Sequence, residues 1–265
     1  MFALIRGAGD LASGIALRLW HSGFDVVMTE LEHPTSIRRT VSFSEAVVRG
    51  RTDVEDVSAQ LAENTTHVRE LLKRNILPVM IDPECQCRKE LRPDILIDAI
   101  LAKRNLGTAI TDAPIVIGVG PGFTAGSDCH AAIETMRGHT LGRAIYHGSP
   151  LPNTNTPGRI GGFTGERVLR APADGIFTGT RQIGDTVEAG DVAGYVADKP
   201  MICTIGGVLR GLLADGTAVH AGMKAGDVDP RGVREYCDTV SDKALAIAGG
   251  VLEAILRLYT DKGEF

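Results

Sequence analysis

A glycine-rich turn between a short apolar strand and a helix, within the first thirty residues, limits the folds open to this chain. Residues 2–5 predict the strand, and the turn Gly7-Ala8-Gly9-Asp10-Leu11-Ala12 follows at once. Apolar residues then recur at helical spacing, and residues 24–28 predict a second strand that ends close to Glu30. The order G-x-G-x-x-A in this setting, with an acidic residue about 20 positions on, is typical of dinucleotide-binding folds. We therefore expect a Rossmann-like α/β domain with a parallel sheet over residues 1–150.

The residues of this turn fit a cofactor-binding role. Gly7 permits the tight turn, Gly9 lets the backbone approach a pyrophosphate, and Ala12 lets helix and strand pack closely. The helix N-terminus attracts an anion, and Glu30 is placed to bond a ribose hydroxyl. Asp10 completes the candidate set, provided that its carboxylate points away from the phosphate or is paired. NAD(P) is the predicted ligand, and the alternative is a turn that needs small residues but binds nothing.

Further strands of the same sheet are predicted from compact apolar runs, which span residues 76–82, 94–99 and 114–119. Each run ends in polar or glycine-rich residues. Because ligands of open α/β sheets bind at the carboxyl ends of the strands, we expect a crevice between these loops and the Gly7–Ala12 turn. The last loop adds Gly120 and Gly122 to the candidate cofactor-binding residues.

The segment after this last loop carries the candidate catalytic residues. A good N-cap residue at position 127 and a glycine at position 138 predict a helix over residues 127–137. The i, i+4, i+7 spacing would place several titratable side chains on one face of that helix. The candidate catalytic residues on this face, and just after the helix, are His130, Glu134, Arg137 and His139. The face suits acid–base chemistry or anion binding, and the alternative is a solvated helix face.

An internal repeat organises the second part of the chain. Gly175 matches Gly207 and Val187 matches Val219, at an offset of 32 residues, among proline, glycine and valine-rich segments. The pattern predicts a small all-β module over residues 166–230 that resembles a biotinyl/lipoyl-like barrel-sandwich hybrid. Lys199, in the turn between the halves, is read as an ordinary exposed lysine, so no covalent lipoyl or biotinyl group is expected. Residues 238–260 predict a C-terminal helix that packs on the α/β domain.

Composition excludes several classes of partner. Acidic residues outnumber basic ones by 33 to 28, and the net charge of −5 argues against a nucleic-acid or anionic-membrane surface. No apolar run approaches the roughly 20 residues that span a bilayer. The five cysteines form an odd set that does not indicate a disulfide framework. We therefore expect a cytoplasmic protein that binds a small anionic ligand, and leave assembly into a homo-oligomer open.

Two cysteines close together suggest a second kind of site. Cys85 and Cys87 fall on the predicted crevice rim, and Cys129 lies near the predicted helix start. Thiolates bind soft metals and selenium species, and a helix N-terminus depresses the pKa of a nearby thiol. The alternative is that these cysteines are buried and inert. No spacing of metal ligands is strong enough to predict a metal site.

Several blocks of the chain together resemble the YqeB family, accessory proteins of selenium-dependent molybdenum hydroxylases. The blocks are Gly7–Ala12, Thr40–Phe43, Asp98–Ala99 with Ala102–Thr108, Gly120–Gly126, Glu134–Arg143 and Asp229–Gly232. The N-terminal part is also similar to XdhC-type maturation factors of xanthine dehydrogenase. The resemblance implies a maturation factor that binds or hands over a nucleotide-bearing molybdenum cofactor or a selenium species, with a molybdenum hydroxylase apoprotein as its partner. The alternative function is an NAD(P)-dependent oxidoreductase, and a maturation chaperone is favoured over an enzyme.

Overall fold

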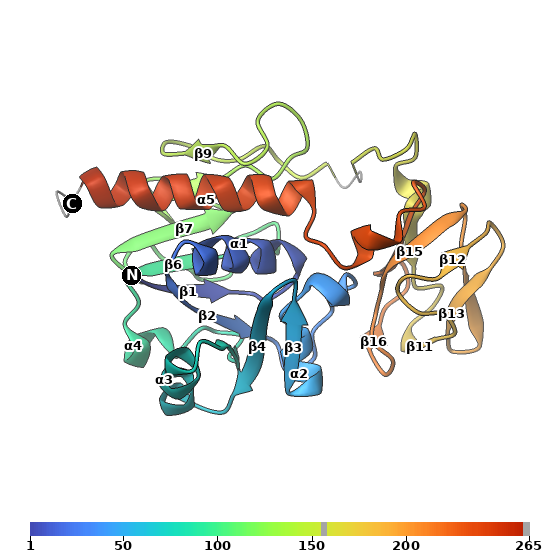
Figure 1. Cartoon of the computed structure of the whole chain (residues 1–265). Coiled ribbons are helices and arrows are strands. Elements are labelled where there is room, and N and C mark those ends of the chain that lie inside the picture. The colour runs from blue at the N-terminus through green and yellow to red at the C-terminus, as the bar shows by residue number, and fades with distance from the viewer. Residues whose placement is uncertain (155–157, 262–265) are drawn as a thin grey trace. The chain divides into compact units, whose positions relative to one another are not determined.

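The computed structural model describes residues 1–154 and 158–261, which divide into two compact units. The first unit combines Met1–Pro34 and Ser42–Thr154 with the chain from Val240 onward. The second combines Thr35–Val41 with the described residues of Asn155–Thr239. Figure 1 shows the elements of both units along the chain. The second unit is thus built from two separate stretches of sequence.

A nine-stranded sheet forms the centre of the first unit, in the order β3-β4-β5-β2-β1-β6-β7-β8-β9. Its strands are β1 (Phe2–Arg6), β2 (Asp25–Glu30), β3 (Arg51–Val54), β4 (Val57–Ala62), β5 (Leu77–Ile81), β6 (Ile95–Asp98), β7 (Ile115–Val119), β8 (Ala131–Ile133) and β9 (Ala144–Ile145). The pairs from β4 to β8 are all parallel, whereas β3 and β9 pair antiparallel at the two edges. The α/β class is confirmed, and the sheet is mixed rather than purely parallel. The chain order of the strands reverses between β1 and β6.

Five α-helices accompany this sheet among the described residues. They are α1 (Asp10–His21), α2 (Glu45–Arg49), α3 (Thr65–Lys73), α4 (Arg88–Leu91) and α5 (Asp242–Asp261). The predicted C-terminal helix is confirmed as α5, and it lies along α1 in Figure 1. Gly14 of α1 permits this close approach, because an added Cβ would lie 2.7 Å from Cβ of Ala244. None of these helices is both long and apolar enough to cross a membrane.

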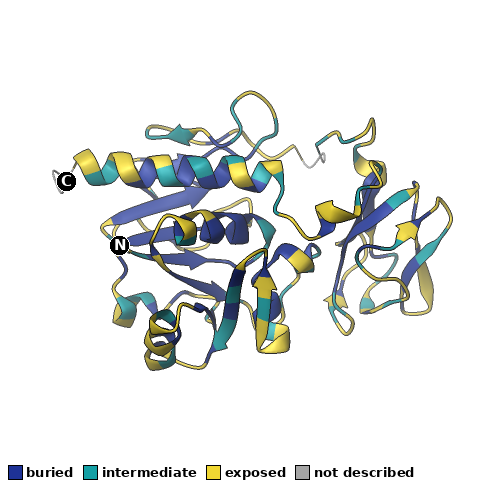
Figure 2. Ribbon diagram, in the orientation of Figure 1, coloured by how far each residue is buried: buried dark blue, intermediate teal, exposed yellow. Residues whose placement is uncertain are grey.

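The central strands are buried on both faces, as Figure 2 shows for β1, β6 and β7. One face carries Leu4, Val27, Leu96, Val116 and Ala132, one residue from each of five neighbouring strands. These residues share a core with three cysteines, Cys85, Cys87 and Cys129. Because side chains alternate along a strand, the residue two positions further on points to this same face. The polar residues at the ends of these strands therefore lie on the same face of the sheet as the apolar core and its three thiols.

The second unit consists of two four-stranded sheets, β10-β17-β15-β12 and β14-β13-β11-β16. The strands are β10 (Val168–Arg170), β11 (Gly175–Gly179), β12 (Thr186–Val187), β13 (Val192–Val196), β14 (Lys199–Ile202), β15 (Gly207–Leu212), β16 (Ala218–Val219) and β17 (Lys224–Asp229). Short 3-10 turns are η1 (Arg39–Val41), η2 (Gly165–Arg167) and η3 (Arg234–Cys237). Strands β11, β12 and β13 begin 32 residues before β15, β16 and β17. Each sheet takes strands from both halves of the repeat.

The repeat offers a matched pair of glycines for a stability prediction. Gly175 and Gly207 begin equivalent strands with φ of +150° and +151°, but a Cβ at Gly207 would lie 2.3 Å from the carbonyl oxygen of Asp229. A Cβ at Gly175 would meet nothing closer than 3.2 Å. We expect Gly207→Ala to cost about 1–3 kcal/mol more than Gly175→Ala, because only the first adds overpacking to backbone strain. Urea denaturation of both variants measures this difference, and equal losses would contradict it.

Candidate functional site

Three polar side chains lie side by side where the central strands of the large sheet end. Arg6, the last residue of β1, is in register with Thr29 of β2 on one side and with Asp98 of β6 on the other. Directly opposed residues project from the same face of a sheet, so the three side chains form one row. All three residues are buried. The row lies where the strand order reverses, which is where open α/β sheets bind ligands.

The guanidinium of Arg6 is the centre of this row. Its Nη1 donates to Asp98 Oδ2 (3.3 Å), Thr108 Oγ1 (3.1 Å) and the Leu106 carbonyl (3.1 Å), and its Nε and Nη2 donate to the Pro83 carbonyl (3.2 and 3.1 Å). The Thr108 hydroxyl donates to the same Asp98 oxygen at 2.6 Å. Asp98 has no exposed surface, so Arg6 and Asp98 form a desolvated ion pair. These contacts fix the cation in a single position.

The loop after β5 brings two thiols to this row. The Asp82 carbonyl accepts a hydrogen bond from the Cys85 amide (3.0 Å), and its carboxylate accepts one from the Cys87 amide (2.7 Å). Arg88 donates to the Cys85 carbonyl at 2.8 Å. Cys85 has a φ of +52°, a left-handed conformation that costs a non-glycine residue about 1–3 kcal/mol. The loop therefore holds both thiols in a defined geometry, with backbone strain at Cys85.

The two thiols differ in acidity. The pKa of Cys85 is lowered, chiefly by the hydrogen bond that the Cys87 thiol donates to it. Thr29 and Arg6 lower this pKa further, whereas burial and Asp82 act to raise it. The pKa of Cys87 is raised by that same hydrogen bond and by burial. Burial likewise raises the pKa of Cys129 to about 11. Cys85 is therefore the thiol most easily converted to a nucleophilic thiolate, with Cys87 as its proton-bearing neighbour.

A small cavity of about 80 Å³ opens onto Cys85. Its lining includes Arg6, Leu106 and Thr108, together with Arg88 and Asp112, which form an ion pair at 3.0 Å. All five cysteines of the chain are buried and have free thiols. Within residues 1–154 and 158–261, no group of three or more His, Cys, Asp or Glu side chains is arranged to hold a metal ion. The cavity thus presents one thiol beside two guanidinium groups, those of Arg6 and Arg88, and beside the carboxylates of Glu84 and Asp112.

The glycine turn at the start of α1 is held by hydrogen bonds and close contacts with other parts of the same chain. Gly7 has a φ of +103°, and a Cβ there would lie 3.1 Å from the Ala99 backbone. The Glu30 carboxylate accepts a hydrogen bond from the Ala8 amide (2.9 Å). Burial raises the pKa of Glu30, and the hydrogen bonds from the Leu31 and Ala8 amides offset part of this rise. The Ala8 carbonyl accepts a hydrogen bond from the Ser44 amide (2.9 Å). Glu30 is therefore used to hold the turn.

The other turn residues lie where the strand–turn–helix pattern places them. Gly9 precedes α1 as its N-cap, and no side chain caps that end of the helix. Asp10 is the first residue of α1, and Ala12 is buried in its first turn. Binding of a nucleotide by Gly7, Gly9, Asp10 and Ala12 stays a prediction.

The predicted helix over residues 127–137 is wrong. Ala131–Ile133 instead form strand β8, which pairs with Ile117–Val119 of β7. The His130 amide donates to the Val116 carbonyl (2.8 Å), and His130 Nδ1 accepts from the Val116 amide (3.0 Å). If these residues formed a helix, the backbone groups on this edge of β7 would lack partners. Pairing between β8 and β7 satisfies them, and this overrides the local helix signals.

The candidate catalytic face consequently does not form. The Glu134 carboxylate is buried and accepts hydrogen bonds from the Met136 and Leu151 amides (2.7 and 2.8 Å). Arg137 makes a two-point ion pair with Asp242 (2.8 and 2.9 Å), and His139 is exposed. His130, Glu134, Arg137 and His139 thus have separate surroundings.

The loop glycines at 120 and 122 serve close packing. Gly120 has a φ of +87° and donates its amide to the Ile133 carbonyl (2.9 Å). Gly122 has a φ of +108°, and a Cβ there would lie 2.5 Å from Cα of Arg104. Both positions therefore require glycine for local reasons, and a ligand role for them stays a prediction.

The sequence predicted that Cys85 and Cys87 lie on the rim, and of the row Arg6, Thr29 and Asp98 only Asp98, at the end of its apolar run, was predicted to lie there as well. Each of these three residues follows an apolar run at the point where a strand ends. A polar residue at the last position of a buried strand is the signal that could have found all three, because such residues meet when the strands are parallel.

Of the comparisons with known proteins, the sequence match to a YqeB protein bears on the resemblance to the YqeB family. No family model matches the chain. The structure has weak similarity to a succinylglutamatedesuccinylase/aspartoacylase from Rhodobacter sphaeroides (22% identity, TM-score 0.22, 24% of this chain and 22% of that one). It also has weak similarity to an aspartoacylase family protein from Mesorhizobium loti (13% identity, TM-score 0.26, 86% and 83%). Both scores are too low to support an inference.

In sequence, the chain is 52% identical over 255 residues to the uncharacterized protein YqeB of Escherichia coli (strain K12). That match covers 96% of this chain and 47% of YqeB, so the chain spans about half the length of this relative. Identity at this level over nearly the whole chain supports the resemblance to the YqeB family.

Proposed function

We propose that this chain is an accessory factor that matures a selenium-dependent molybdenum hydroxylase by carrying a selenium or related species to the apoprotein. The observation that carries the proposal is the site at the ends of β1, β2 and β6, where an activated thiol lies beside a fixed guanidinium. Soft, polarisable species bind thiolates, and the adjacent cation favours an anionic cargo. The resemblance to the YqeB family supplies the class of partner.

Two features of the architecture support this proposal. The parallel strands β5-β2-β1-β6-β7-β8 follow the order typical of Rossmann-like folds, and the thiol site lies at the reversal point of that order. The exchange of strands between repeated halves in the second unit supports a biotinyl/lipoyl-like module. There, Ala197 and Asp198 have φ of +47° and +62°, as in a tight hairpin turn, and Lys199 begins β14 as an exposed residue. The absence of a covalent group on Lys199 stays a prediction.

An NAD(P)-dependent oxidoreductase is the second candidate. The uncapped N-terminus of α1 after a Gly-x-Gly turn favours it, because such ends bind pyrophosphate. The engagement of Glu30 with the Ala8 amide weighs against it, since this carboxylate is no longer free to bond a ribose. The same helix end supports the binding of a nucleotide-bearing molybdenum cofactor equally well. Calorimetric titration with NAD(H), NADP(H) and a molybdenum-cofactor analogue separates these ligands.

The maturation proposal is tested in a native host that lacks this chain. We expect the deletion to lower both the activity and the selenium content of the partner hydroxylase, and the wild-type chain supplied in trans to restore both. Hydroxylase antigen levels are measured in parallel, so that loss of selenium is distinguished from loss of the protein. An unchanged selenium content in the deletion strain would remove the basis of the proposal.

A further inference from the structure

The cavity at Cys85 is too small for the ligands that the rest of the chain suggests. Sites for drug-sized molecules measure about 300–1,000 Å³, whereas this cavity measures about 80 Å³. A nucleotide or a pterin therefore does not fit. Water occupies roughly 30 Å³ in the liquid, so a ligand of only a few atoms fits beside the thiol.

Charged groups of both signs surround Cys85: the guanidinium groups of Arg6 and Arg88, and the carboxylates of Asp82, Glu84, Asp98 and Asp112. Arg6 contributes a guanidinium that is 5% exposed and cannot lose its proton in a protein. Its carboxylate partner Asp98 lies on the neighbouring strand, and the exposed Glu84 carboxylate approaches Arg6 only to 3.9 Å. The Thr108 hydroxyl also lines this cavity, with its proton donated to Asp98. A small anion attached to Cys85 would meet a cation that is already fixed in place.

A buried hydroxyl next to Cys85 has no other role in the structure. The Thr29 side chain is 1% exposed, and its hydroxyl has no hydrogen-bond partner of ordinary geometry in the described part of the chain. It lies close enough to Cys85 to favour the thiolate form. Leaving a buried hydroxyl unpaired is destabilising, so its presence here indicates a group that it stabilises when a charge forms. The Cys87 thiol supplies a second donor to Cys85.

We propose that Cys85 accepts the terminal chalcogen atom of a low-molecular-weight persulfide or selenopersulfide and stores it in this cavity as a protein-bound persulfide. The Cys85 thiolate attacks the terminal sulfur of R–S–SH, and a new S–S bond forms as the donor's S–S bond breaks. The electron pair of the broken bond leaves with R–S⁻, so the products are Cys85–S–SH and R–S⁻, with no external oxidant or reductant. This inference deepens the proposed function, on which it rests, by naming the atom that carries the cargo.

The surroundings favour transfer of the terminal atom over formation of a mixed disulfide. A stored terminal sulfur or selenium ionises to an anion, which Arg6 stabilises at short range. A thiolate can attack either sulfur of a persulfide. Attack on the inner sulfur would leave the whole R group attached to Cys85, and a cavity of this size does not accommodate a peptide such as glutathione.

The experiment treats the reduced full-length chain with glutathione persulfide, or with its selenium analogue, under anaerobic conditions. Intact-mass measurement and peptide mapping after alkylation then locate any added atom. We expect a gain of one sulfur or one selenium atom on Cys85, complete loss of this gain in Cys85→Ser, and its retention in Cys129→Ser. The Cys129 variant is the matched control, because Cys129 is also buried in the same core but has a raised pKa.

A second variant separates activation of the thiol from folding. Thr29→Val keeps the branched shape and removes only the hydroxyl, so we expect a slower gain and an upward shift of the pH midpoint of the rate, with the melting temperature maintained or raised. A glutathione adduct on Cys85, or equal labelling of Cys85 and Cys129, would overturn the proposal. So would an unchanged gain in Cys85→Ser. These results do not depend on the hydroxylase, so failure here leaves the deletion experiment free to support maturation by another route.

Discussion

Replacing Arg6 by methionine is expected to lower the free energy of unfolding of the first unit by about 3–5 kcal/mol, because the variant buries an uncompensated charge. Asp98 has no exposed surface and would keep only its neutral donors, Thr108 and the amide of Ile100. The Pro83 and Leu106 carbonyls would lose their guanidinium donors as well. Chemical denaturation followed by circular dichroism measures the loss.

Two comparisons make this expectation specific. Arg137→Met removes an ion pair in the same unit, but the Asp242 side chain there is 75% exposed, so we expect a cost of less than about 1 kcal/mol. The double variant Arg6→Met/Asp98→Asn removes both charges and should recover a large part of the loss. Equal costs for Arg6→Met and Arg137→Met would show that the buried pair has no special weight.

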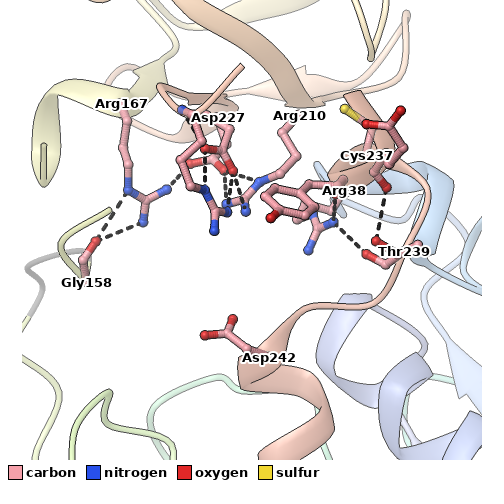
Figure 3. A network of polar contacts seen from close by, with 12 residues as sticks. Arg38, Gly158, Arg167, Arg210, Asp227, Cys237, Thr239 and Asp242 are labelled. Carbon is pink, nitrogen blue, oxygen red and sulfur yellow. Dashed lines mark hydrogen bonds and ion pairs between the residues drawn. The ribbon is translucent and has the colours of Figure 1, made fainter. Parts of the chain in front are cut away.

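Replacing Asp227 by asparagine is expected to destabilise the second unit by about 3–5 kcal/mol, through the opposite imbalance of charge. The Asp227 carboxylate bonds Arg167 through one oxygen and Arg210 through the other, at 2.6 and 3.1 Å for Arg210 (Figure 3). All three residues are buried. Without the carboxylate, two desolvated guanidinium groups would face each other, with Asp229 left as the carboxylate for Arg210 at 3.0 Å.

A surface pair in the same unit provides the control for this second variant. Asp191 pairs with Arg181 at 3.4 Å, and both side chains are partly exposed. Asp191→Asn is therefore expected to cost less than about 1 kcal/mol. Thermal unfolding of the two variants side by side measures the contrast. A small effect of Asp227→Asn would mean that the two arginines find other partners once the carboxylate is gone.

Features of the fold that depend on neighbouring residues were predictable from the sequence. The strand, turn and helix from Phe2 to His21 follow one another directly, so the glycine pattern and helical spacing identify them. The apolar runs of β6 and β7 are compact and end in polar residues, as buried parallel strands do. The repeated glycines also place three pairs of strands at equivalent positions in the second unit.

Features that depend on pairing in space were not predictable in this way. Strand β8 has only three residues, and its hydrogen bonds with β7 decide its conformation against a local helix signal. The row of Thr29, Arg6 and Asp98 exists only because three strands distant in sequence share one register. Thr29 and Arg6 of that row add to the activation of Cys85, which comes chiefly from the neighbouring Cys87 thiol. A single sequence contains the residues of the site but not the register that assembles them.

The division of each unit between distant stretches of chain has a consequence for synthesis on the ribosome. Ile37 packs against the core of the second unit and accepts a hydrogen bond from the Leu212 amide (2.7 Å), while the first unit acquires α5 from Asp242–Asp261. At about 5–20 residues per second, residues 35–41 emerge roughly ten seconds or more before the last strands of their own unit. Neither unit can complete its core until the chain has been synthesised well past residue 220, because the second unit extends to Thr239 and the first resumes at Val240. A nascent chain stalled at residue 150 would therefore expose the apolar face of α1, and early binding by a ribosome-associated chaperone is the expected protection.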